Sequence, residues 1–381
     1  MNGQGLYNGS LDVFLVGVRA DFDAVQDQAK IAVTSLEQNG LLSTDKDTTG
    51  IFTQVSNMEN QGNRVVWRHT GSTGVSKTGS RVAGGVYPQA NFNRLWETVV
   101  VDPDNQDANE INVPEERLNA ESAEYKDALD RALKLNLDLR RKNMGDPFDV
   151  FNQAFVAPSS YASTKFVGKG NNGLDGSGTA LGEALITYQH KLAYTNATAA
   201  TSSTATNGCG NAVTSSGNYA ALSPTSYNSA LELGATFVDD VNKPMSMFGG
   251  LNTIIVPRAN GLVATAKQIN ESDWTVGSSN NEVNVYKSTM GKIISSPFLT
   301  NSVNYTTANT QNKKWFVVDN SYTDPKVGNG LVRVSFVPTQ SNVFRSPERN
   351  ALVYQAKQSY SYAWVDWRNT LGSLGDLSAA S

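Results

Sequence analysis

Cysteine and histidine are nearly absent from this 381-residue chain, which has one cysteine and two histidines. The single cysteine, Cys209, excludes a disulfide framework and a cysteine-rich zinc or iron–sulfur site within one chain. The histidines, His69 and His190, stand far apart and belong to no metal-binding motif such as H-E-x-x-H, so a histidine-built site is not expected. We therefore expect neither a metal ion nor a cofactor.

Charged residues and long apolar runs are also scarce. Charged residues make up 17% of the chain, against about 25% in typical soluble proteins. The net charge of −4 and the lack of a basic run disfavour binding to nucleic-acid phosphates by the whole chain. No stretch approaches the roughly 18 apolar residues of a membrane span, and no signal-peptide pattern begins the chain. These absences favour a soluble protein made in the cytoplasm.

The polar content consists largely of asparagine, serine, threonine, glutamine and glycine, with 32 glycines. This composition suits β-structure with long polar loops better than a helical bundle. It also suits surfaces that meet other protein surfaces without strong like-charge repulsion. The length predicts about two or three domains with a sizeable core.

The first third of the chain predicts an extended arm and a long β-hairpin. Residues 11–16 are typical of a short strand, and the apolar spacing over 21–36 predicts a helix. Residues 64–68 and 94–101 are strand-like and are joined by a segment rich in glycine, serine and threonine, which predicts a hairpin. Few residues near its tip are large enough for a core, so the hairpin should project. Because a bare ribbon is marginally stable in water, we expect a partner to cover it.

Residues 114–143 predict a long amphipathic helix, the clearest local pattern in the chain. Pro114 suits a first helical turn, and apolar side chains recur at three- and four-residue spacing. Arg140, Arg141 and Lys142 complement the negative end of the helix dipole. A stop at residues 145–147 gives a rod on the order of 40 Å long. Its simplest role is that of a helix lying on a domain.

The remainder predicts a mixed α/β body. Residues 195–218 are polar and of low complexity, which predicts a long surface loop without a core. A helix should begin at Pro224, with Tyr227, Leu231 and Phe237 facing inward. A buried strand at 253–257 should be followed by a helix through Leu262, Ala266 and Ile269. Further strands are expected at 282–286, 315–318, 331–337 (Val332, Val334 and Phe336 alternating with Arg333 and Ser335) and 352–367.

No segment predicts an active site. Gly176–Gly182 is rich in glycine but lacks the Gly-Lys-Ser/Thr ending of a phosphate loop, so a turn before a helix is favoured. Asp102–Asp107 lacks the glycine and glutamate of a calcium loop and is expected to be a solvated turn. The sequence has no G-x-S-x-G motif that would supply a nucleophilic serine for His190, and Cys209 has no nearby base in the sequence. We therefore expect no catalytic residue and no enzyme; the alternative is a nucleotide-dependent enzyme that uses the Gly176–Gly182 segment.

Five segments carry a family resemblance, and they occur in the order that the family requires. They are residues 174–192 (L-D-G to Y-Q-H-K-L), 222–231 (L-S-P-T-S-Y-N-S-A-L), 253–257 (T-I-I-V-P) before an alanine-rich helix, 291–300 (G-K-I-I-S-S-P-F-L-T) with 315–319 (W-F-V-V-D), and 366–368 (D-W-R). Asn369 replaces the glycine that usually follows the last motif. Over about residues 60–375 the chain resembles the major capsid proteins of tailed bacteriophages, with the Hong Kong 97 phage-type fold.

The resemblance implies an α+β fold with a division of the chain into five parts. These are an N-terminal arm with a short helix (1–60), a projecting β-hairpin called the E-loop (61–113), a spine helix with the first part of the P-domain (114–180), an A-domain with P-domain strands (181–340), and a C-terminal P-domain strand and tail (341–381). The hairpin and arm would bury their surface only on neighbouring subunits.

The implied function is that of a major head protein, which self-assembles into pentamers and hexamers of an icosahedral shell around double-stranded DNA. Expected partners are copies of the chain, possible scaffold, portal and decoration proteins, and packaged DNA without sequence-specific binding, but no membrane. The expected location is the virion, after synthesis in the host bacterial cytoplasm. The alternative is an encapsulin-like or other self-assembling shell protein.

Part of this family forms a covalent Lys–Asn crosslink between subunits, with the lysine on the E-loop. Lys77 lies at the predicted hairpin tip, and Asn342 and Asn350 lie in the C-terminal region. The alternative for Lys77 is a solvent-exposed lysine that keeps the tip soluble. Denaturing gels of mature particles that show only the monomer band would contradict the crosslink.

Overall fold

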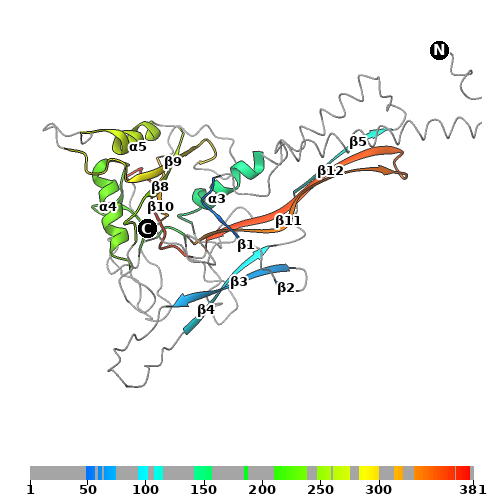
Figure 1. Cartoon of the computed structure of the whole chain (residues 1–381), viewed down its shortest axis with the longest axis horizontal. Coiled ribbons are helices and arrows are strands. Elements are labelled where there is room, and N and C mark those ends of the chain that lie inside the picture. Colours follow the sequence, from blue (N-terminus) through cyan, green and yellow to red (C-terminus); the bar gives the residue numbers. More distant parts are fainter. Residues whose placement is uncertain are drawn as a thin grey trace, which may run out of the picture. The chain divides into compact units, whose positions relative to one another are not determined.

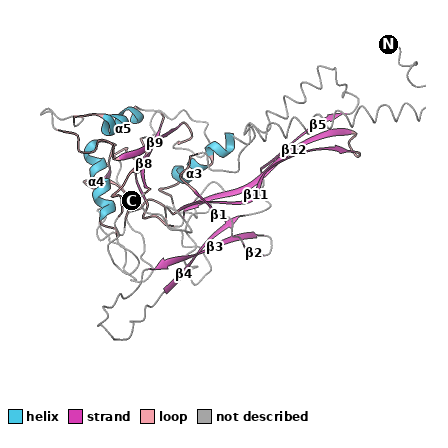
Figure 2. Cartoon of the chain, in the orientation of Figure 1, coloured by secondary structure: helices cyan, strands magenta, loops and turns pink. Residues whose placement is uncertain are grey.

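The computed structural model describes residues 49–55, 59–61, 64–73, 93–101, 107–114, 141–156, 184–187, 210–237, 247–258, 261–274, 283–299, 313–320, 330–364 and 366–377 (Figures 1 and 2). The chain forms two compact units. The first comprises residues 1–48, 103–144 and 335–360, and the second comprises 49–102, 145–334 and 361–381. Each unit is described below by itself.

A four-stranded sheet with the order β13-β10-β8-β9 forms the centre of the second unit. Its strands are β8 (Asn252–Pro257), β9 (Met290–Ser296), β10 (Trp315–Asp319) and β13 (Thr370–Ser373). β10 is antiparallel to both β8 and β13, whereas β8 and β9 are parallel. Every residue of β8, β10 and β13 is buried, which confirms the buried strands predicted at 253–257 and 315–318.

Two helices lie beside this sheet (Figure 1). α5 (Leu262–Glu271) connects β8 to its parallel neighbour β9 and packs against both. Its buried residues are Leu262, Ala266 and Ile269, as predicted. α4 (Pro224–Ala235) begins at the predicted proline and is capped by reciprocal hydrogen bonds between Ser223 and Ser226.

Aromatic rings join the short helix α3 (Pro147–Asn152) to strands of the second unit. The ring of Phe52 lies 4.8 Å from Tyr362 and 6.2 Å from Phe151, centroid to centroid. Phe151 in turn lies 5.1 Å from Phe316 of β10. Such tilted and edge-to-face pairs are favourable beyond the apolar area that they bury.

Arg333, which alternates with apolar residues in the strand predicted at 331–337, is buried like its apolar neighbours Val332 and Val334. β1 (Thr53–Val55) pairs in parallel with the start of β11 (Leu331–Ser346), so a further strand covers this edge. The Arg333 side chain is fully buried, donates to the Gln54 side chain at 3.0 Å, and lies 5.8 Å from the Tyr362 ring centroid. A polar partner and an aromatic face thus allow the guanidinium to be buried.

The predicted hairpin is confirmed in its two arms. β3 (Arg64–Thr73) and β4 (Asn93–Val101) are antiparallel, from the pair Val65–Val101 to the pair Thr73–Asn93. β2 (Glu59–Gln61) adds a third strand, giving the order β2-β3-β4. The expected tip, with Lys77, lies outside the described residues.

In the first unit, β5 (Asp107–Pro114) pairs with β12 (Ala351–Trp364) in antiparallel register, from Pro114–Ala351 to Asp107–Gln358. Pro114 therefore ends a strand, and the prediction that it starts a helix is wrong. The predicted helix end is confirmed, because residues 141–145 are helical and Asp146 forms a turn. Residues 115–140 lie outside the described part of the chain, as do the segments predicted at 11–16 and 21–36.

Two further sequence predictions need correction. The strand expected at 282–286 is a turn over residues 285–288, preceded by one isolated bridge between Val283 and Trp274. The surface loop expected at 195–218 is wrong for residues 210–213, which are buried and include Asn211, Ala212 and Val213. This stretch continues into a small antiparallel pair, β6 (Thr214–Ser215) with β7 (Asn218–Tyr219).

Candidate functional site

The residues singled out in the sequence are not gathered at one place in the described part of the chain. His69 lies on β3 opposite Glu97, and Asn342 and Asn350 are exposed at β11 and in the turn after it. Gly176–Gly182, His190, Cys209 and Lys77 lie outside the described residues, as does the predicted solvated turn at Asp102–Asp107 except for Asp107. Among the described residues, no group of His, Cys, Asp and Glu side chains could hold a metal ion.

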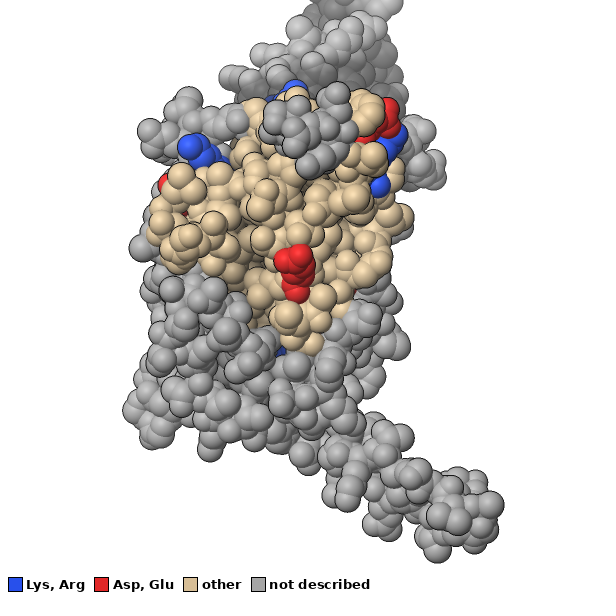
Figure 3. Space-filling view, turned by 90° about the vertical axis from the view of Figure 1, so that its left-hand side faces the viewer, with Lys and Arg blue, Asp and Glu red and all other residues tan. Residues whose placement is uncertain are grey.

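Among the described helices of the second unit, α4 has the smallest share of charged residues. Glu232 is the one charged side chain among the helix's twelve residues, and it accepts a hydrogen bond from Asn228 at 2.8 Å. Leu231 and Leu233 beside it are half-buried. Figure 3 views the molecule from the side on which α4 and α5 lie in Figure 1, and shows a broad uncharged area interrupted by isolated charged groups. Such a face can meet a protein surface with little desolvation of charge.

Two edge strands offer backbone groups for pairing. β4 ends the sheet β2-β3-β4, and β5 ends the sheet β1-β11-β12-β5, so neither has a second strand partner among the described residues. The row of N–H and C=O groups on an edge strand is a template for pairing with another chain. Both strands are thus candidate association elements.

A polar cluster fixes the register of β5 on β12 within the first unit. Glu110 accepts hydrogen bonds from Gln355, at 2.6 Å, and from the Arg349 guanidinium. These contacts lower the pKa of the Glu110 carboxyl; the Gln355 hydrogen bond is the largest cause, followed by that with Asn112. The carboxylate therefore remains charged at neutral pH and anchors the turn after β11.

Asn211 is a fully buried polar side chain of the second unit with four hydrogen bonds to backbone groups of two other segments. Its Nδ2 donates to the carbonyl oxygens of Leu185 at 2.8 Å, Thr370 at 2.7 Å and Trp367 at 3.3 Å. Its Oδ1 accepts from the Thr187 backbone at 3.0 Å. One amide thus ties three separate segments together. Sequence reasoning missed it because Asn211 lies in a polar run whose composition is typical of loops.

The D-W-R segment packs inward. The Asp366 carboxylate accepts from the Arg368 backbone at 3.0 Å and from its guanidinium at 3.3 Å. The guanidinium lies 5.0 Å from the Trp367 ring centroid, and this ring contacts Phe237 at 5.2 Å. The motif therefore stabilises the packing behind α4 instead of presenting a reactive group.

Lys314 is the one described titratable group with a large pKa shift. Its buried ammonium donates to the carbonyl oxygen of Asn152, the last residue of α3, at 3.1 Å. Burial lowers the pKa of Lys314 to about 8, while the charge of Asp376 opposes this shift. Since the side chain is only 7% exposed, its role is to hold the carboxyl end of α3 to the start of β10.

Among the described residues, no helix is long and apolar enough to cross a membrane. No protein-family model matches the chain, and no curated protein matches it in sequence.

Solved structures similar to the chain are mainly capsid proteins. The capsid of cyanophage P-SCSP1u has a TM-score of 0.41 at 12% identity, over 87% of this chain and 88% of that one. The mature capsid of bacteriophage PhiM1 has a TM-score of 0.40 at 11% identity, over 87% and 86%. The procapsid of satellite phage P4, which includes a size determination protein, has a TM-score of 0.37 at 11% identity, over 93% and 89%.

Proposed function

We propose that the chain is the major capsid protein of a tailed bacteriophage, which assembles into pentamers and hexamers of an icosahedral shell around double-stranded DNA. The observation that carries the proposal is the order of elements along the chain. The hairpin β3–β4 precedes a helical segment that ends at residue 145, and α4, β8, α5, β9 and β10 follow it. The long strands β11 and β12 come next, and the short strand β13 then returns to the sheet of β8, β9 and β10. This order supports the E-loop, spine helix, A-domain and P-domain that the sequence resemblance implies.

The proposed domains keep the boundaries expected from the sequence: arm 1–60, E-loop 61–113, spine 114–180, A-domain with P-domain strands 181–340 and C-terminal strand 341–381. The edge strands β4 and β5 and the weakly charged face of α4 support self-association. Shells are built from heterologous contacts that close when the rotation between copies permits. Such contacts need surfaces without strong like-charge repulsion.

The proposed partners are further copies of the chain, with scaffold, portal and decoration proteins as additional ones. The DNA would be enclosed without sequence-specific contacts, and a net charge of −4 disfavours tight binding of phosphates by the chain as a whole. The proposed role is structural, without catalysis, and the proposed location is the virion after synthesis in the host cytoplasm.

Self-assembly of the purified full-length chain tests the proposal. Sedimentation velocity over a range of protein concentrations, with negative-stain electron microscopy of the fractions, should show rings of five or six copies and closed shells. Because the α4 face is nearly uncharged, assembly should persist between about 0.1 M and 1 M salt, over which the Debye length falls from about 10 Å to 3 Å. Monomers or dimers alone at every concentration would refute the proposal.

A further inference from the structure

Three exposed apolar side chains lie together beyond the end of α5. Trp274 is 55% exposed, and Val283 and Val285 are 71% and 72% exposed. Trp274 and Val283 face each other across an isolated antiparallel bridge, and Val285 follows two residues later. We call these three residues the Trp274 patch. Single exposed apolar residues are ordinary, whereas the largest apolar patches on a protein surface are often functional.

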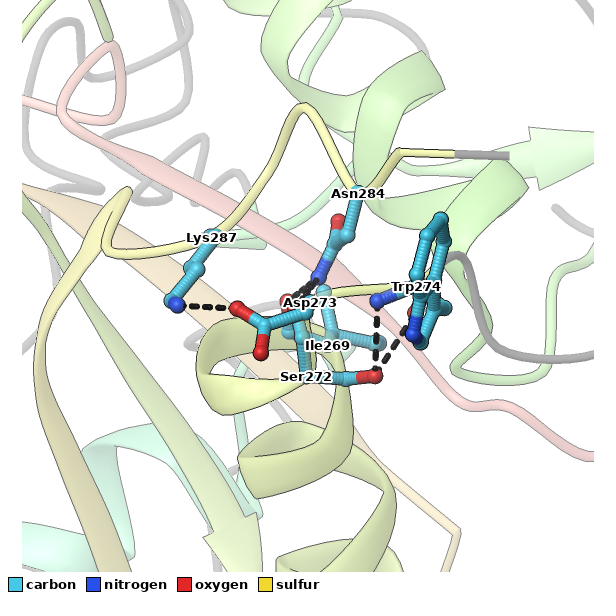
Figure 4. A network of polar contacts seen from close by, with 6 residues as sticks. All are labelled: Ile269, Ser272, Asp273, Trp274, Asn284 and Lys287. Carbon is cyan, nitrogen blue, oxygen red and sulfur yellow. Dashed lines mark hydrogen bonds and ion pairs between the residues drawn. The ribbon is translucent and has the colours of Figure 1, made fainter. Parts of the chain in front are cut away.

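A buried asparagine holds the patch in place (Figure 4). The Asn284 amide donates to the carbonyl oxygens of Ile269 at 2.7 Å and Ser272 at 2.9 Å, both at the end of α5. Its own backbone N–H donates to the Asp273 carbonyl at 3.1 Å. Asn284 is buried, whereas Val283 and Val285 on either side of it are exposed.

The tryptophan is fixed by a second set of hydrogen bonds (Figure 4). The Ser272 hydroxyl accepts from the Trp274 backbone N–H at 3.2 Å and donates to the Trp274 carbonyl at 2.7 Å. An ion pair between Lys287 and Asp273 closes the loop on the other side. The backbone that carries the patch is therefore held in place, which reduces the conformational entropy lost when the patch is covered.

The size and charge of the patch indicate what covers it. A half-exposed tryptophan and two exposed valines present on the order of 300 Å² of surface, well below the roughly 800 Å² that each partner contributes to a stable two-protein interface. The patch is thus too small to bind a partner alone and fits a chain that meets its partner at several surfaces. The charges of Asp273 and Lys287 beside it offset one another, and the exposed Glu271 at the end of α5 is the one further described charge close by in the sequence, so an identical copy meets little like-charge repulsion.

We infer that the Trp274 patch is a contact surface for a second copy of this chain and that Trp274 is its energetic centre. The inference rests on the proposed function, since it requires a chain that joins its copies through several contacts. Tryptophan at the centre of an interface commonly contributes tenfold or more to affinity.

The test compares assembly thresholds of full-length variants by sedimentation velocity. Trp274→Ser should raise the protein concentration needed for assembly at least tenfold, and the double variant Val283→Ser/Val285→Ser should raise it severalfold. Trp274→Phe keeps an aromatic ring and should stay close to the wild type. Leu251→Ser is the matched control, because Leu251 is 60% exposed at the start of β8 and lies outside the patch; it should leave the threshold within about twofold.

Circular dichroism and thermal unfolding of each variant separate loss of assembly from loss of folding. If Trp274→Ser does not fold, the assembly threshold of the double variant Val283→Ser/Val285→Ser tests the inference instead, and a threshold equal to that of the wild type would overturn it. A folded Trp274→Ser chain that assembles at the wild-type threshold would overturn the inference and leave the proposed function intact. Equal losses in Leu251→Ser and Trp274→Ser would also overturn it. A wild-type chain that never assembles would instead refute the proposed function, and the inference with it.

Discussion

Removal of the Asn211 side chain should strongly destabilise the second unit. In Asn211→Ala the carbonyls of Leu185 and Thr370 each lose a short hydrogen bond and the Thr187 N–H loses its acceptor, all at a fully buried position. A buried polar group left without its partner costs about 1–3 kcal/mol. Allowing for relaxation, the free energy of unfolding should fall by about 3–5 kcal/mol, a large part of the 5–15 kcal/mol typical of a domain.

Urea unfolding of the unassembled chain at pH 7, followed by circular dichroism, measures this loss. The matched control is Asn228→Ala, since the Asn228 amide hydrogen-bonds Glu232 in an exposed position and its loss should change little. A value for Asn211→Ala within 1 kcal/mol of the wild type would refute the reasoning.

The variant Asn211→Asp tests the same contacts through the pH dependence of stability. The new carboxylate would face the carbonyl oxygens that the amide now donates to, so its pKa in the folded state should rise. The folded form then binds more protons than the unfolded form, and the stability of this variant should increase as the pH falls from 7 towards 4. A variant whose stability relative to the wild type is independent of pH would contradict this account.

Three further predictions concern local contacts. Burial lowers the pKa of Lys314 from 10.5 to about 8, so the unfolded chain binds more protons than the folded chain between these pH values. The free energy of unfolding of the wild type, measured with urea, should therefore rise by about 2 kcal/mol from pH 8 to 10. Lys314→Met should not show this rise. Gly330→Ala should lower the thermal midpoint, because φ is +81° and the added Cβ would lie 2.7 Å from the Asp366 carbonyl oxygen, whereas Gly249→Ala, with open space, should not. Ser223→Ala removes the α4 cap and should cost about 1 kcal/mol in urea unfolding.

Elements whose own residues determine their structure were predictable from the sequence. The apolar runs of β8 and β10 and the proline that starts α4 specify these elements locally. The two arms of the hairpin β3–β4 were predictable for the same reason, since β-rich runs flank a segment of turn residues.

Contacts between distant segments were not predictable. The alternation of Val283, Asn284 and Val285 is typical of a strand. The Asn284 amide nevertheless donates hydrogen bonds to the backbone carbonyl oxygens at the end of α5, and the chain turns at this point. The burial of Arg333 could not be predicted from its own strand, because it depends on the pairing of β1 with β11 and on the hydrogen bond that Arg333 donates to Gln54 of β1. The Trp274 patch likewise depends on a bridge between two segments, and no local pattern in the sequence indicates it.

Cryo-electron microscopy of particles formed by the full-length chain tests the central claim most directly. The account predicts closed shells with icosahedral symmetry, built from rings of five and six copies, in which β3–β4 lies on a neighbouring subunit. Particles without such rings, or a chain that stays monomeric or dimeric at high concentration, would contradict it.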